Sequence, residues 1–289
     1  MSFEIKKFAS HGVNNPIVAR LSLQNLQILE KCKVTKEVKD NVGSLYLNSL
    51  MKKLLRCWEI EDSFKKSFEE AAAKYKPPAT PNALVEIPQI ERLEADGHNF
   101  LYEAKNYIRD VLYVVNKLYG TSFSEASEFS KARKGGKGGK SLIEFATETF
   151  GPDDARTKIL VGAAPFVEEA IAMRNAVDHP DGYSGRLVIE NFRRYPDQKL
   201  SEPVWYRVKD GKNATEPSTI RADFDTFIHN LLTLGEDMLV TWANENLESP
   251  EMMEIVVIPD ERRDPKNPAK YTVGPGPKLR EAFAKLPGS

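Results

Sequence analysis

The chain has few residues of the types that build structural metal sites or disulfide frameworks. Its 289 residues include only two cysteines, Cys32 and Cys57, and four histidines. The two cysteines do not have the spacing of metal ligands, so we expect reduced thiols and no bound metal. No cofactor motif is present either, and none is expected.

Long apolar segments are also absent. No apolar run approaches the roughly 18 residues that a membrane-spanning helix requires. The first residues contain Lys6 and Lys7 but no apolar region after them, which argues against a secretory signal. We therefore expect a soluble, cytoplasmic protein without membrane contact.

Neither sign of charge dominates the chain, and the common hydrolase motifs are missing. The net charge is −1, so any contact with nucleic acid must come from a local basic patch. The absence of G-x-S-x-G and H-E-x-x-H disfavours nucleophile-elbow hydrolases and zinc proteases. The contents of hydrophobic residues (41%) and charged residues (29%) are ordinary, which excludes wholesale disorder.

Helical periodicity dominates what the chain does contain. Apolar residues recur at close to 3.6 over 88–118, and further helices are expected over 140–149 and 220–247. Another helix should begin near 153, pause at Gly162, resume at Pro165 and end at His179, before Pro180. The segments 186–192 and 204–208 predict a β-hairpin.

A proline-rich segment suggests how these elements are divided. Pro77, Pro78 and Pro81 cannot continue a helix, so 77–87 is predicted to be a linker. It would separate a mixed, partly helical region at 1–76 from a helical bundle at 88–258, with the hairpin near 186–208 inserted in it. Residues 259–289 are expected to form an extended tail. The predicted fold class is mainly α.

The most informative element is the segment from Arg174 to Pro180. Arg174 occupies a position that the apolar pattern of its helix would fill with leucine, and a charge there needs a partner or a ligand. His179 follows five residues later, at the helix end. Arginine binds phosphate through two donors, and histidine transfers protons near neutral pH, so the two together suit phosphodiester chemistry.

The string Arg174-Asn175-x-x-x-His179-Pro180, at the end of a long helix in an α-bundle, resembles the R-x(4–6)-H motif of the HEPN superfamily. The resemblance covers roughly residues 88–248. It implies a homodimer with facing motifs and a metal-independent endoribonuclease that leaves a 2′,3′-cyclic phosphate. His179 would be the general acid/base, Arg174 would bind the phosphate and Asn175 would orient the site. Toxin–antitoxin or phage-defence systems, with an antitoxin partner, are the implied setting.

Other interpretations of the same residues stay open. Asp178 lies four residues after Arg174, so the two can form an intrahelical ion pair with no catalytic role. Some HEPN proteins lack activity, and a non-catalytic helical module that binds RNA or a partner protein is the alternative. A third interpretation is that the chain is an unrelated helical protein and that its match to the motif is a coincidence.

A glycine-rich segment at 131–141 is the best basic patch. It fails the P-loop spacing because Lys134 stands where the first glycine should be, and it does not follow a strand. We interpret it as a solvated loop, or as a weak contact for an RNA backbone. Its cations are Lys131, Arg133, Lys134, Lys137 and Lys140.

Overall fold

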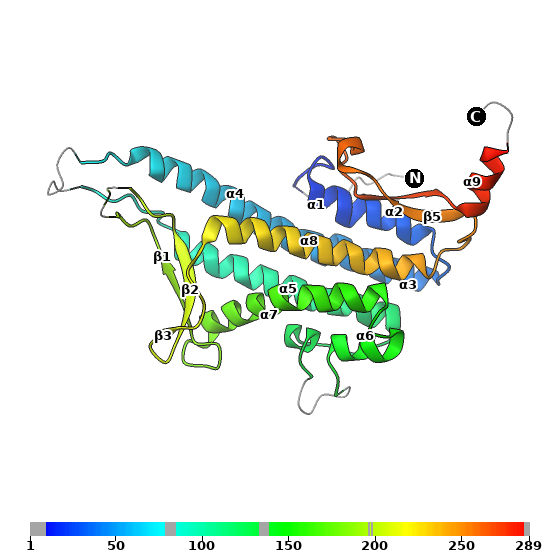
Figure 1. Cartoon of the computed structure of the whole chain (residues 1–289), viewed down its shortest axis with the longest axis horizontal. Helices are drawn as coiled ribbons and strands as arrows, with labels where there is room; N and C mark the ends of the chain where they lie inside the picture. The colour runs from blue at the N-terminus through cyan, green and yellow to red at the C-terminus, as the bar shows by residue number, and fades with distance from the viewer. Residues whose placement is uncertain (1–9, 79–84, 133–138, 196, 198, 286–289) are drawn as a thin grey trace, which may run out of the picture. The chain divides into compact units, whose positions relative to one another are not determined.

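Four long helices are the largest elements of the described structure. The computed structural model describes residues 10–78, 85–132, 139–195, 197 and 199–285, and Figure 1 shows the order of its elements. The long helices are α4 (Met51–Lys74), α5 (Leu93–Tyr119), α7 (Ala155–Asp178) and α8 (Ile220–Asn244). The expected mainly-α class is therefore confirmed.

Shorter helices account for the N-terminal region, whose pattern fits a strand or a helix about equally well. They are α1 (Pro16–Val18), the π-helical turn η1 (Ala19–Gln24), α2 (Asn25–Glu30), α3 (Lys36–Leu45) and the π-helical turn η2 (Tyr46–Leu50). The side chains of Asn15 and Thr35 accept backbone N–H bonds at the starts of α1 and α3. These N-caps fix two starts that apolar spacing alone does not mark.

The remaining helices are also short. They are η3 (Ala126–Phe129), α6 (Leu142–Phe150), η4 (Asp260–Arg262) and α9 (Pro277–Ala284). Ser141 and Glu144 form a reciprocal capping box at the start of α6. Gly151, with a positive φ of 93°, follows its last residue.

The predicted β-hairpin is confirmed. Strands β1 (Arg186–Glu190) and β2 (Val204–Lys209) pair antiparallel and lie side by side in Figure 1. The short strands β3 (Lys212–Asn213) and β4 (Ser218–Thr219) extend this sheet along β2. A second antiparallel pair joins β5 (Met253–Val257) to β6 (Tyr271–Pro275).

The chain divides into two units, and each is built from separate stretches. Unit 1 comprises 1–54, 107–164 and 231–289, and unit 2 comprises 55–106 and 165–230. Each long helix contributes residues to both units. Each unit combines stretches that are far apart in the sequence, and the linear division at the proline-rich segment 77–87 stays a prediction.

Aromatic side chains form the core of unit 2. Phe100 of α5 and Phe224 of α8 stack with ring centroids 4.0 Å apart, and both are fully buried. Trp205 of β2 contacts Phe224 edge to face at 5.5 Å, and Phe64 of α4 does so at 5.6 Å. The sheet is thereby fixed to α5 and α8 within the unit.

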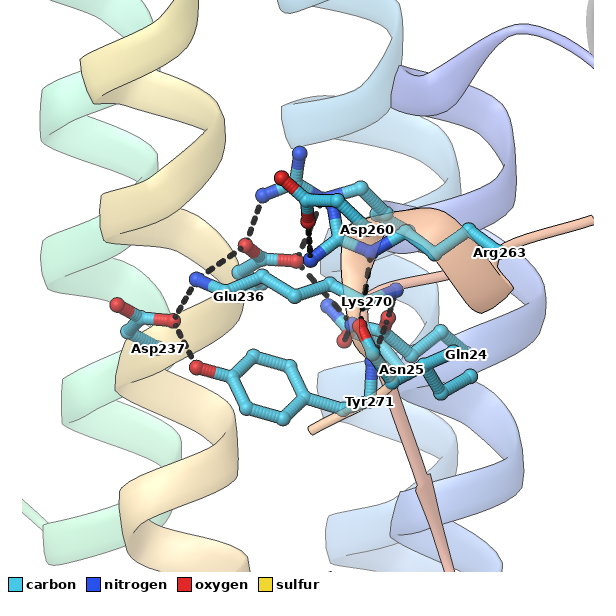
Figure 2. Close-up of polar contacts among 10 residues, drawn as sticks. Gln24, Asn25, Glu236, Asp237, Asp260, Arg263, Lys270 and Tyr271 are labelled. Carbon is cyan, nitrogen blue, oxygen red and sulfur yellow. Dashed lines mark hydrogen bonds and ion pairs between the residues drawn. The ribbon is translucent and has the colours of Figure 1, made fainter. Parts of the chain in front are cut away.

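Unit 1 contains a buried polar cluster instead. Glu236 of α8 is completely buried and forms an ion pair with Arg20, and Lys270 lies 3.1 Å from it. Figure 2 shows Lys270 reaching between Glu236 and Asp237, while the Tyr271 hydroxyl donates to Asp237 at 2.8 Å. These contacts attach the β5–β6 hairpin to α8.

Two expectations differ from the structure. The helix ending at His179 does not pause at Gly162, because α7 continues through Pro165. Val161, Gly162 and Pro165 are all exposed, so the hydrogen bond that proline removes lies on the solvent-facing side. The tail expected to be extended contains β6, η4 and α9, because β6 pairs with β5 and its loop contacts α8.

Candidate functional site

Arg174 lies on α7 within unit 2, and its charge is already engaged. Its side chain is 13% exposed and forms an ion pair with Asp178, the residue four positions later. The guanidinium also lies over the Tyr102 ring of α5, 5.3 Å from the ring centroid. The partner that a charge on the apolar side requires is thus supplied by a carboxylate and an exposed aromatic ring.

His179 is the first residue beyond α7, and its side chain is exposed. Its backbone N–H donates to the Asn175 carbonyl at 2.8 Å, which completes the last turn. Within the described ranges the imidazole has no hydrogen bond or ion pair. It is therefore accessible to a ligand from solvent.

Helix geometry separates Arg174 from His179 within one copy. With 3.6 residues per turn, two side chains five positions apart point in directions that differ by roughly 140° around the helix axis. Two side chains four positions apart lie on nearly the same face. Asp178, four positions on, therefore contacts Arg174. No hydrogen bond or ion pair joins Arg174 to His179 in the part of the chain that the structure describes.

Asn175 contacts a basic residue rather than either motif partner. Its Oδ1 accepts a hydrogen bond from Lys105 Nζ of α5 at 2.8 Å. Lys105 is half-buried, and Tyr102 precedes it by three residues on the same helix. The motif helix thus shares one polar surface with α5.

His98 lies one turn before Tyr102 on α5. Burial lowers its pKa; Glu94 opposes this effect, and the positive charge of Arg174 adds to it. A lowered pKa favours the neutral imidazole at physiological pH. His98 is half-buried, as a histidine packed on a helix is.

The turn between α7 and β1 positions His179 relative to the sheet. Gly182 N–H donates to the His179 carbonyl at 2.8 Å, and Gly185 N–H donates to the Gly182 carbonyl at 3.0 Å. Gly185 has a φ of +74°, and a Cβ there would lie 2.3 Å from the Val208 carbonyl oxygen. Only glycine fits this close approach of the turn to β2.

An ion pair holds the same turn from the other side. Arg207 of β2 donates to Glu169 of α7 at 3.0 Å and to the Ser184 carbonyl at 3.1 Å. The next exposed ring along the turn is Tyr183, which is 85% exposed, and Lys209 Nζ lies 4.8 Å from its centroid. Two exposed tyrosines therefore each have a cation against the ring: Tyr102 on α5 and Tyr183 in the turn that follows the motif.

The glycine-rich basic segment is only partly described. Lys131 is exposed, and Lys140 forms an ion pair with Glu148 of α6. The other three expected contacts, Arg133, Lys134 and Lys137, lie outside the described residues. Lys131 and Lys140 belong to unit 1, whereas the motif belongs to unit 2.

The described residues contain neither a metal-binding cluster nor a membrane-spanning helix. Among the described residues, no group of histidine, cysteine, aspartate and glutamate side chains is arranged to hold a metal ion. None of the described helices combines the length and the apolar character that crossing a bilayer requires.

Sequence reasoning missed the contribution of α5. The R-x(4–6)-H motif lies at the end of α7, so neither Tyr102 nor Lys105 of α5 follows from it. His98, Tyr102 and Lys105 recur at i, i+4 and i+7, which places them on one helix face. Their shared face is the signal in the sequence that points to α5.

Comparisons of the chain with protein-family models, with curated proteins and with solved structures find no significant match.

Proposed function

We propose that the chain is a metal-independent endoribonuclease of HEPN type. The observation that carries the proposal is the imidazole of His179 at the end of α7, which is exposed and has no hydrogen bond or ion pair with any described residue. A proton-transfer group must reach its substrate, and an imidazole does this best near neutral pH.

The surface around the motif suits single-stranded RNA. Nucleic-acid sites of this kind combine cations for the backbone with aromatic rings on which bases stack. Tyr102 and Tyr183 provide exposed rings, and Arg174, Lys105 and Lys209 provide the cations beside them. This combination favours RNA over a cationic or a purely apolar ligand at this surface.

In the proposed reaction His179 takes the proton of a ribose 2′-hydroxyl. The 2′-oxygen attacks the adjacent phosphorus, and the bond to the 5′-oxygen of the next nucleotide breaks as that oxygen accepts a proton from solvent water. The products are a 2′,3′-cyclic phosphate and a free 5′-hydroxyl. Arg174 neutralises the phosphate, and Asn175 orients the site. A homodimer would bring two motifs together, as in the family that the motif resembles.

The test is cleavage of single-stranded RNA by the purified full chain in EDTA. We expect cyclic-phosphate ends, and a loss of roughly 100-fold or more in rate for His179→Ala, the contribution typical of an acid–base group. His229→Ala is the matched control, since His229 is an exposed histidine of α8 in the same unit. The proposal fails if wild type cleaves no RNA, or if His179→Ala cleaves as fast as wild type.

A second candidate function has its own supporting observation. The Arg174–Asp178 ion pair favours a non-catalytic module that binds RNA or a partner protein. It predicts RNA binding or dimerisation without cleavage, and binding that does not change in His179→Ala. A toxin or phage-defence role with an antitoxin partner belongs to the first candidate, and co-purification of the chain with a neutralising protein would test it.

A further inference from the structure

Unit 2 contains a cavity that the motif does not use. Its volume is about 290 Å³, and its walls come from α7, β2, the segment 215–218 and the first turns of α8. Small-molecule sites have volumes of about 300 to 1,000 Å³, so this cavity suits a ligand with one ring or a short chain. Phe166, Met173, Tyr206 and Phe227 form its apolar and aromatic walls.

The charged side chains that line the cavity are all carboxylates. They are Glu169, Glu216 and Asp223, and the lining contains no lysine, arginine or histidine. Glu169 is neutralised by Arg207, which donates to both of its oxygens. Glu216 and Asp223 therefore give the cavity a negative charge, which disfavours phosphates and carboxylates as ligands.

Asp223 is oriented so that one oxygen is left for a ligand. Trp205 Nε1 donates to Asp223 Oδ2 at 2.5 Å, and the Ser218 hydroxyl donates to the same oxygen. Oδ1 accepts no hydrogen bond from any described residue. The two donors thus hold the carboxylate through Oδ2, and Asp223 is one of the residues that line the cavity.

We propose that this cavity binds a small organic cation, an ammonium group carried on an aromatic or aliphatic stem. The ammonium group donates to Asp223 Oδ1, and the stem lies against Phe166, Met173 and Phe227. Aromatic rings beside the ammonium add cation–π attraction. A neutral apolar ligand would strip water from Asp223 without replacing its hydrogen bonds, and an anion would be repelled.

The test uses three probes of one shape and different charge: benzylamine, benzyl alcohol and benzoate. Isothermal titration of the full chain should show binding of benzylamine, and at least about tenfold weaker binding of the other two, a difference of about 1.4 kcal/mol. Equal affinity for benzylamine and benzyl alcohol, or no binding of benzylamine, would overturn the proposal.

Two further measurements locate the site. Asp223→Asn should weaken benzylamine at least tenfold, whereas Glu168→Gln, which removes the same charge from an exposed neighbour outside the lining, should change it less than twofold. In wild type, benzylamine should shift the indole N–H resonance of Trp205 among the three tryptophans. An unmoved Trp205 resonance refutes the site, even if Asp223→Asn fails to fold.

Discussion

Replacing Glu236 by glutamine should be among the most destabilising conservative substitutions in unit 1. The Glu236 carboxylate is fully buried, and Arg20 Nε donates to its Oε2 at 2.7 Å while Arg20 Nη2 contacts its Oε1. Gln24 Nε2 donates to Oε2 at 3.3 Å, and Lys270 Nζ lies 3.1 Å from Oε1. The carboxylate therefore balances two cations that have little contact with water (Figure 2).

The magnitude follows from what the substitution leaves behind. The Arg20 side chain is 10% exposed and that of Lys270 is 20% exposed, so neither charge can be fully hydrated after the carboxylate is lost. Removing one partner of a buried ion pair costs about 3 to 5 kcal/mol. Asp237 remains 3.1 Å from Lys270 and compensates in part, so the lower end of this range, about 3 kcal/mol, is expected.

The assay is urea unfolding of wild type, Glu236→Gln and the control Glu251→Gln. Glu251 pairs with Lys278, and both side chains are more than half exposed, so the control should cost less than about 1 kcal/mol. Combining Glu236→Gln with Arg20→Met should cost less than the sum of the two single changes, because the unpaired charge is removed. A cost below about 1 kcal/mol for Glu236→Gln would refute the reasoning about burial.

Three further predictions concern unit 2. Burial raises the pKa of Glu61 to about 7, so the folded state keeps a proton that the unfolded state loses above about pH 4.5. The free energy of unfolding therefore falls as pH rises between these two values. Glu61→Gln cannot ionise, so urea unfolding should show it about 1 to 3 kcal/mol more stable than wild type at pH 8 and little different at pH 4. Gly185→Ala should lower the free energy of unfolding by more than about 2 kcal/mol in thermal unfolding, because the added Cβ would meet the Val208 carbonyl. The control Gly211→Ala has a similar φ of +73° but open space around the Cβ, so it should cost only about 1 kcal/mol. Equal costs for the two variants would contradict the steric argument. Asp178→Asn removes a negative charge and frees the guanidinium of Arg174. We expect several-fold tighter RNA binding in a filter assay, with a change in the free energy of unfolding under about 0.5 kcal/mol. Weaker RNA binding would count against a phosphate-binding role for Arg174.

The helices and the hairpin could be predicted because their signals are local. The apolar spacing of α5 and α8 and the positive φ at Gly120, one residue after α5, depend only on nearby residues. The course of α7 through Pro165 could not be predicted, because proline is tolerated there only when the lost hydrogen bond faces solvent. That condition depends on which side of the helix the rest of the fold covers.

The attachment of the β5–β6 hairpin shows a different limit. Lys270 and Tyr271 lie in a segment rich in proline and in charged residues, and this composition predicts an extended tail. Their backbone N–H groups donate to Gln24 Oε1 at 2.7 and 2.8 Å, across about 250 positions of sequence. A contact between such distant residues leaves no periodic signal, since each one is an ordinary polar residue in its own segment.

The candidate site combines both cases, and its geometry sharpens the dimer hypothesis. The Arg174–Asp178 pair follows from i, i+4 spacing and was an open alternative from the sequence, whereas Tyr102 and Lys105 depend on tertiary contact. Because helix phase turns His179 away from Arg174 by roughly 140°, one copy does not direct both side chains to the same phosphate. Under the proposed function, a phosphodiester held by Arg174 of one copy must meet the imidazole of a second copy, or Arg174 must leave Asp178 to reach it. Under the proposed function, the Arg174–Asp178 ion pair is therefore linked to the proposed homodimer. The free energy that breaks the ion pair has to come from RNA binding or from formation of the dimer.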